Sequence, residues 1–243
     1  MTGSSYKAKL GKLLADVRAE EQALWDALSD EERNAGGKVD RWAPKDHLAH
    51  VTFWTERLVT QLQAATGAEP PGPIEDFHKT NDEVFEANKN RNWEDVLAWA
   101  TEVSRKFHTA LDAVSEEMLE DTAGSEGTGG PPLWRNVAFT GVYHPMHHVA
   151  DVYIERGDFE GAQSLQERVT EGMAALDESD AWQGTTQYNL ACFYALHDKP
   201  QQALTLLTTA LKRAPDLIEW SKQDGDLDSL RELPEFQALL VDG

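Results

Sequence analysis

Four long segments of this 243-residue chain repeat apolar residues at helical spacing, and no segment alternates apolar and polar residues as a half-buried strand does. Each segment carries a single apolar stripe, so each must bury that stripe against the others. Four long amphipathic helices joined by long loops are typical of a four-helix bundle. The predicted fold class is therefore all-α. The four helices are expected over about residues 6–28, 44–66, 93–114 and 134–156.

The connecting segments are marked by proline and glycine. Residues 67–73 hold three prolines and two glycines and predict a crossover loop, and Gly124–Pro132 predicts a second one. Between the second and third helices, residues 74–92 predict a short helix lying over the bundle. Ser29–Glu32 predicts a helix cap followed by a short turn.

Beyond Gly157 the pattern changes to that of a repeat. The spacing of small and apolar residues is similar to the tetratricopeptide repeat (TPR), a pair of antiparallel helices. Residues 150–165 align with 191–206 at an offset of 41, so the fourth helix is expected to end one domain and begin the next. We predict a bundle at 1–156 and a TPR-like helical domain at 157–243, rigidly fused and closed by terminal helices. The residues at TPR-like spacing are Leu190, Ala191, Tyr194, Ala203, Leu207, Ala210 and Pro215.

Charge and composition exclude several classes of function. The formal net charge of −21 repels nucleic acid and anionic membrane surfaces. No run of apolar residues approaches the roughly 20 needed to span a bilayer, and residues 1–5 lack the apolar core of a signal peptide. A lone cysteine, Cys192, provides no disulfide framework. A cytoplasmic location is the expectation.

Two histidines on the fourth helix suggest a metal site. His144 and His148 are four residues apart, so their side chains are neighbours on a helix. Two imidazoles so placed can share a divalent ion, and a third ligand from another helix leaves one coordination position open. The candidate third ligand is His50. Such an ion can lower the pKa of bound water toward about 7 or bind an external thiol as thiolate.

Two features weigh against this site. Pro145 removes a helix hydrogen bond and crowds the carbonyl of Gly141, which predicts a kink. The main apolar stripe of the fourth helix also lies opposite His144 and His148 on an ideal α-helix. Our hypothesis is that this helix is buried on two faces, with the histidines toward the bundle interior and the other stripe toward the repeat helices. Exposed histidines on a solvated face are the alternative.

The segment Trp42–Val51, followed by Trp54, resembles the second-helix signature of DinB/YfiT-like four-helix bundles, in which a histidine follows a tryptophan by eight residues. Together with Asn81–Phe85, Leu133–Arg135 and His144–His148, it looks most like the ClbS/DfsB branch of that superfamily, over residues 5–156. The resemblance implies a bundle that holds zinc, nickel or a similar divalent ion on three histidines. Matched by position, these ligands are His50, His144 and His148; members without the full triad bind no metal.

The resemblance also implies the function. We expect a metal-dependent enzyme that uses water, or a low-molecular-weight thiol as cosubstrate, against a small electrophilic molecule in detoxification or resistance. No catalytic base follows from spacing, although His47, His147 and Asp151 stand beside the candidate ligands and can orient them or lie at the surface. Cys192 is interpreted as a packing residue.

The alternative function belongs to another class. A metal-free bundle would sequester a small molecule, or act as a scaffold whose TPR-like helices bind a protein partner. A third possibility is a resistance protein that hydrolyses a small molecule without a metal ion. A single repeat favours a structural appendage, because a concave binding surface needs about three repeats. Relatives of such bundles often form homodimers, but no residue pattern here identifies an interface.

Overall fold

The structure, a computed structural model, describes residues 5–122 and 131–241. Within these residues the chain is helical and forms no strand beyond an isolated bridge between Lys38 and Arg41, so the all-α prediction is confirmed. The chain divides into two compact units, residues 1–162 and 163–243. The domain boundary between residues 156 and 157 stays a prediction. The predicted loop at 124–132 and the N-terminal residues 1–4 lie mostly or wholly outside the described residues.

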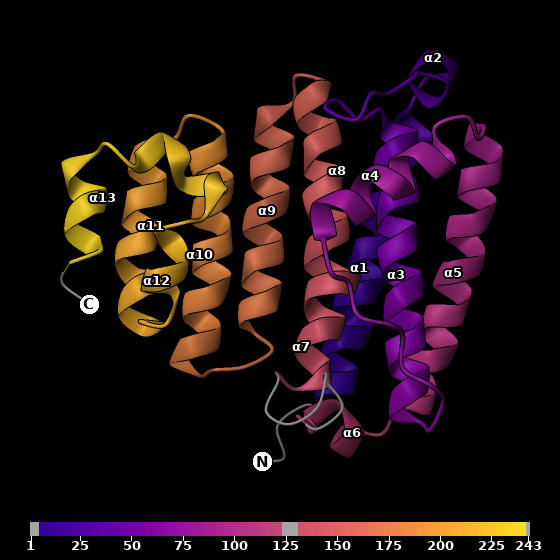
Figure 1. Cartoon of the computed structure of the whole chain (residues 1–243), viewed down its shortest axis with the longest axis horizontal. Coiled ribbons are helices and arrows are strands. Elements are labelled where there is room, and N and C mark those ends of the chain that lie inside the picture. Colours follow the sequence, from indigo (N-terminus) through magenta and orange to yellow (C-terminus); the bar gives the residue numbers. More distant parts are fainter. Residues whose placement is uncertain (1–4, 123–130, 242–243) are drawn as a thin grey trace. The chain divides into compact units, whose positions relative to one another are not determined.

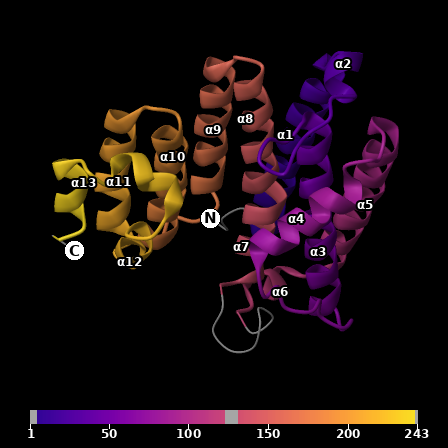
Figure 2. The same cartoon turned by 45° about the horizontal axis from the view of Figure 1, so that its top comes forward.

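The first unit is the predicted four-helix bundle. Its long helices run side by side in both views of the molecule, and α4 crosses α3 (Figures 1 and 2). Serine and asparagine side chains cap several helix starts; Asn92, for example, accepts a hydrogen bond from the Asp95 amide at 2.7 Å. The long helices are α1 (Tyr6–Ala27), α3 (Pro44–Ala65), α5 (Trp93–Ala113) and a fourth helix in three parts, α7 (Leu133–Ala138), η1 (Phe139–Tyr143) and α8 (His144–Glu155). The short helices are α2 (Asp30–Arg33), α4 (Phe77–Asn88) and α6 (Glu116–Glu120).

The core of the bundle is formed by the predicted stripes. Leu10 and Leu24 of α1, Leu62 of α3 and Val96 of α5 are at most 1% exposed. The close approach of the helices depends on a small residue at Gly141, where an added Cβ would lie 3.1 Å from Phe107 Cζ. Packing of these stripes holds the elements that carry the histidines in fixed register.

The fourth helix contains a π-helical turn just before the histidines. Over η1 the hydrogen bonds widen, and the His144 amide donates to the carbonyl of Phe139, five residues back. This turn accommodates Pro145, which has no amide hydrogen to offer and whose ring would crowd the carbonyl of Gly141 in a regular α-helix. The predicted kink is thus absorbed as a π-turn.

Both faces of the fourth helix are buried, as the hypothesis of two buried faces requires. Val137 and Val152, on the histidine side, are fully buried, and Met146 and Val149 on the other side are each 1% exposed. Packing of that second stripe against the repeat helices stays a prediction. Among the described residues, no helix is both long enough and apolar enough to cross a membrane.

The second unit consists of most of one helix and a compact set of further helices. The indole of Trp182, fully buried, donates a hydrogen bond to the Met173 carbonyl at 2.7 Å, and the hydroxyl of Tyr194 donates to Glu167 Oε1 at 2.6 Å. Cys192 is 5% exposed, as expected of a packing residue. The helices are α9 (Phe159–Ala174), α10 (Asp180–Leu196), α11 (Pro200–Arg213), α12 (Leu217–Ser221), η2 (Gly225–Leu230) and α13 (Pro234–Leu239).

Small residues allow α10 and α11 to lie close together, and this contact can be tested. A Cβ added at Gly184 would lie 2.7 Å from Ala214 Cβ and 2.8 Å from the Ala210 carbonyl oxygen. Gly184→Val is therefore expected to destabilise the second unit by about 1–3 kcal/mol, as overpacking usually does. Urea unfolding measures the change, with Thr185→Val at the neighbouring half-buried position as a control. Equal stability of the two variants would contradict the close approach.

Candidate metal centre

The start of α3 is built to present histidines toward the fourth helix. Pro44 occupies the first turn, where its missing amide hydrogen costs nothing, and Asp46 accepts a hydrogen bond from the Ala43 amide at 3.0 Å. The buried ammonium of Lys45 donates to the carbonyls of Lys89 and Arg91 at 2.7 and 3.0 Å. This turn is therefore anchored both to its own cap and to the segment after α4.

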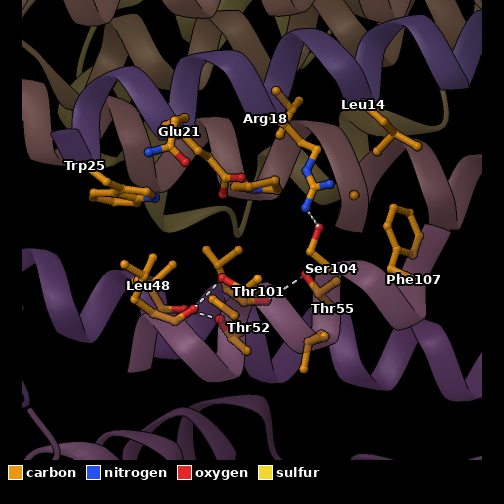
Figure 3. A pocket seen from close by; sticks show the side chains of 18 of the residues that line it. Leu14, Arg18, Glu21, Trp25, Leu48, Thr52, Thr55, Thr101, Ser104 and Phe107 are labelled. Atoms are coloured by element: carbon orange, nitrogen blue, oxygen red, sulfur yellow. Dashed lines mark hydrogen bonds between the residues drawn. The ribbon is translucent and has the colours of Figure 1, made fainter. Parts of the chain in front are cut away.

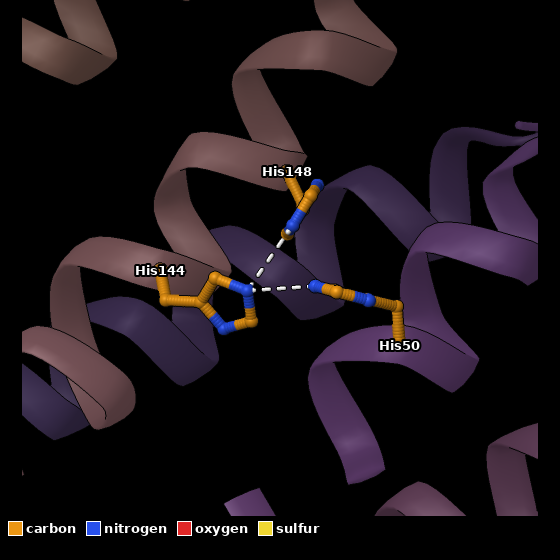
Figure 4. A group of neighbouring side chains, drawn as sticks. All are labelled: His50, His144 and His148. Atoms are coloured by element: carbon orange, nitrogen blue, oxygen red, sulfur yellow. Dashed lines mark hydrogen bonds between the residues drawn. The ribbon is translucent and has the colours of Figure 1, made fainter. Parts of the chain in front are cut away.

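Three histidines meet between α3 and α8 (Figure 4). His144 Nε2 lies 2.9 Å from His50 Nε2 and 3.2 Å from His148 Nε2. An ion with bonds of about 2.05 Å in tetrahedral geometry sets its nitrogen ligands about 3.3 Å apart. These two distances are therefore close to the separation that one bound divalent ion requires, and the ligand atoms of all three histidines lie within 4.8 Å of one another.

Hydrogen bonding alone leaves this cluster unsatisfied. A neutral imidazole has one N–H and one lone pair, and His148 Nδ1 lies 3.1 Å from Asp151 Oδ2, which only accepts when ionised. If the His148 proton is on Nδ1, its Nε2 offers a lone pair to His144. A proton on His144 Nε2 would then have to be shared between two neighbours, and without that proton the contact between His144 and His148 would pair two lone pairs. Three lone pairs directed at one cation need no such proton.

Burial keeps these imidazoles neutral. It lowers the pKa of His50 to about 3 and holds the pKa of His144 well below the ordinary value, with the neighbouring histidines adding to both effects. The pKa of His148 is also lowered, chiefly by burial, although the hydrogen bond to Asp151 opposes this. Neutral imidazole is the form that binds metal, so the cluster is ready to act as a ligand set at neutral pH.

Asp151 orients His148 from the side opposite the shared centre. Its carboxylate has a pKa lowered to about 2, because the hydrogen bond to His148 and the nearby histidines outweigh the effect of burial. A carboxylate that accepts from the second ring nitrogen of a ligating histidine is a common feature of metal sites. His50 and His144 have no such acceptor, since their buried Nδ1 atoms lack a hydrogen-bond partner among the described residues.

Two further aromatic rings complete the cluster. Trp42 packs on His50 and His148 with ring centroids 4.6 and 5.7 Å apart. His47 is 6% exposed, and its Nδ1 lies 3.0 Å from His148 Nδ1 and 3.9 Å from Asp151 Oδ2. These two rings restrict the orientation of the His50 and His148 imidazoles and shield them from water.

The comparisons with known proteins agree with this architecture. The family model for the DinB superfamily matches residues 13–152, more than half of the chain. The chain belongs to the DinB superfamily. A tetratricopeptide repeat model matches residues 143–216 of this DinB-superfamily protein, which is compatible with a protein partner for that region. No curated protein and no solved structure matches the chain.

In this DinB-superfamily chain the structure brings together the three histidines that the sequence singled out, and adds neighbours that the sequence only hinted at. His47 and Asp151 join the cluster, whereas His147 lies at its edge, with Nε2 4.0 Å from Asp151 Oδ2. The contact of Trp42 with the imidazoles was not predicted. Its position eight residues before His50 marked a family signature but gave no contact.

Proposed function

We propose that this DinB-superfamily protein is a metal-dependent enzyme that acts on a small electrophilic molecule, by hydrolysis or by transfer of a low-molecular-weight thiol. The observation that supports the proposal most strongly is the convergence of three Nε2 lone pairs from His50, His144 and His148. Assignment to the ClbS/DfsB branch is part of the proposal and is supported by the resemblance of Leu133–Arg135 and His144–His148 to that branch.

Each residue has a defined role in this proposal. His50, His144 and His148 would hold the ion, and Asp151 would fix the tautomer and plane of His148. Trp42 would keep bulk water from the imidazoles. When bound, a zinc or nickel ion supplies Lewis-acid chemistry and lowers the pKa of a water molecule or thiol. Burial raises the pKa of the Cys192 thiol, so the protein's own cysteine is a poor nucleophile and an external thiol is needed for transfer.

The metal content of the purified protein tests the proposal. Untagged protein prepared without chelator is expected to contain about one zinc, nickel or manganese ion per chain by elemental mass spectrometry. His144→Ala should lose that ion, while His78→Ala, which removes an exposed histidine of α4, should retain it. A wild-type protein that stays metal-free after reconstitution with each ion would refute the proposal.

Activity is tested on the same set of proteins. Turnover of aryl halides and epoxides, with and without a low-molecular-weight thiol, should fall by at least about a hundredfold in His144→Ala and remain unchanged in His78→Ala. If the protein contains stoichiometric metal but turns over none of these electrophiles, the metal site is supported and the enzymatic role is refuted.

A further inference from the structure

A cavity of about 130 Å³ lies within the bundle, between α1, α3 and α5 (Figure 3). None of the clustered histidines lines it, so it is separate from the candidate metal centre. Gly141 and Pro145 of the fourth helix contribute to its wall. Apolar residues make up somewhat more than half of the lining, with Leu14, Val17, Trp25, Leu48, Val51 and Phe107 among the contributors.

One carboxylate interrupts this apolar lining. Glu21 lies four residues after Val17 and three before Leu24, in the middle of the buried stripe of α1. Its half-buried side chain makes no hydrogen bond or ion pair with the described part of the chain. Burial raises the pKa of Glu21 to about 7, opposed by the charge of Arg18. A carboxylate in such surroundings is costly unless a donor reaches it.

Several other polar groups of the cavity donate a hydrogen elsewhere. Thr52, Thr55 and Thr101 donate their hydroxyl hydrogens to carbonyls of their own helices at 2.7 to 2.8 Å. Arg18, an exposed residue, donates to the hydroxyl of Ser104. The oxygen lone pairs of these threonines therefore add acceptors to the carboxylate of Glu21, while Arg18, Gln22 and His108 contribute N–H groups to the same lining. The carboxylate and the threonine oxygens would match a ligand group rich in donors.

We propose that this cavity binds a primary ammonium ion carried on a compact apolar body about the size of one aromatic ring. The ammonium group has three donors for Glu21 and the threonine oxygens, and the apolar body packs on apolar lining residues near Glu21 such as Val17, one helical turn away. A cavity of about 150 Å³ in another protein is large enough for benzene, which sets the size of the ligand. The net charge of −21 attracts cations to the protein.

Binding of benzylamine, with benzyl alcohol as its neutral analogue, tests the proposal. Titration followed by NMR at pH 8 is expected to show benzylamine binding to wild type and to Asp16→Asn, which removes an equal charge from an exposed position of α1. Glu21→Gln should weaken benzylamine at least about tenfold and leave benzyl alcohol unchanged. Thr52→Val, which keeps the side-chain shape and removes an acceptor, should also weaken benzylamine.

Equal benzylamine affinity in wild type and Glu21→Gln, or no binding to folded wild type, would overturn the proposal. The titrations use protein treated with chelator, so their outcome does not depend on the metal centre, and a metal-free protein that binds benzylamine would reject only the proposed function.

The pH dependence gives a second readout. Benzylamine remains protonated between pH 6 and 8, while Glu21 ionises, so the affinity should rise with pH. Arg18 stays charged across this range, and His108, whose pKa is lowered chiefly by burial, stays neutral through most of it. In Glu21→Gln the affinity should be nearly independent of pH, and a parallel rise in that variant would also overturn the proposal.

Discussion

Chelation is expected to lower the free energy of unfolding of the wild-type protein by about 4 kcal/mol, if free metal had been present at about a thousand times its Kd. An ion held by His50 on α3 and by His144 and His148 on α8 cross-links two helices and exists only in the folded state. Differential scanning calorimetry with and without chelator measures the effect, as a fall in Tm on the order of 10 °C.

The matched variants separate a ligand effect from a general one. His50→Ala should unfold at nearly the same temperature with and without chelator, because its site no longer binds the ion. His78→Ala should respond to chelator as the wild type does, since His78 is exposed and lies outside the cluster. A chelator effect in His50→Ala as large as in the wild type would place the stabilising ion elsewhere.

The metal-free protein is expected to lose stability steeply as the pH falls from about 6.5 to 5. Burial lowers the pKa of His47 and of His50 to about 3, whereas in the unfolded chain both titrate near 6.5. The unfolded state then binds more protons than the folded state, so the free energy of unfolding decreases with decreasing pH. Each histidine contributes up to about 1.4 kcal/mol per pH unit within this window.

Urea unfolding of chelated protein at several pH values from 6.5 to 5 measures this slope. Most carboxylates take up protons below this range. Glu21, whose pKa is raised to about 7 by burial, opposes the slope by up to about 1.4 kcal/mol per pH unit, but the buried histidines outnumber it. His47→Gln should reduce the slope by about 1.4 kcal/mol per pH unit and His78→Gln should leave it unchanged. A slope near zero in the wild type would show that the imidazoles are not held neutral by burial.

The long helices could be predicted because their stripes must be buried. Leu10 and Leu24 lie about four helical turns apart and Val96 and Val103 about two, and the structure buries each of them. The helix α6 was not predicted, because five residues after the Ser115 cap are too few to show a period.

The candidate site could be predicted only in part. The pair His144 and His148 followed from spacing on one helix, and His50 from the family resemblance. Sequence separation gave no information on how Trp42, His47 and Asp151 lie around them, because those contacts arise from packing between α3 and α8. The π-turn was not predicted either. Pro145 indicated a disturbance, but the prediction assumed a regular α-helix through residues 134–156. That assumption placed the histidines one residue out of register with the residues before the turn.

That extra residue in η1 has a consequence for how this chain tolerates changes in length. Each residue advances an α-helix by about 100°, so deleting one residue between Phe139 and Tyr143 would turn the π-turn into an ordinary helical turn. Because the wide turn absorbs that one residue, His144 and His148 would keep their aim at His50, but the ring of Pro145 would then crowd the carbonyl four residues before it. A deletion elsewhere in this helix, where no wide turn absorbs it, would rotate the histidines by about 100° relative to the residues before the deletion and should be far more damaging to the cluster.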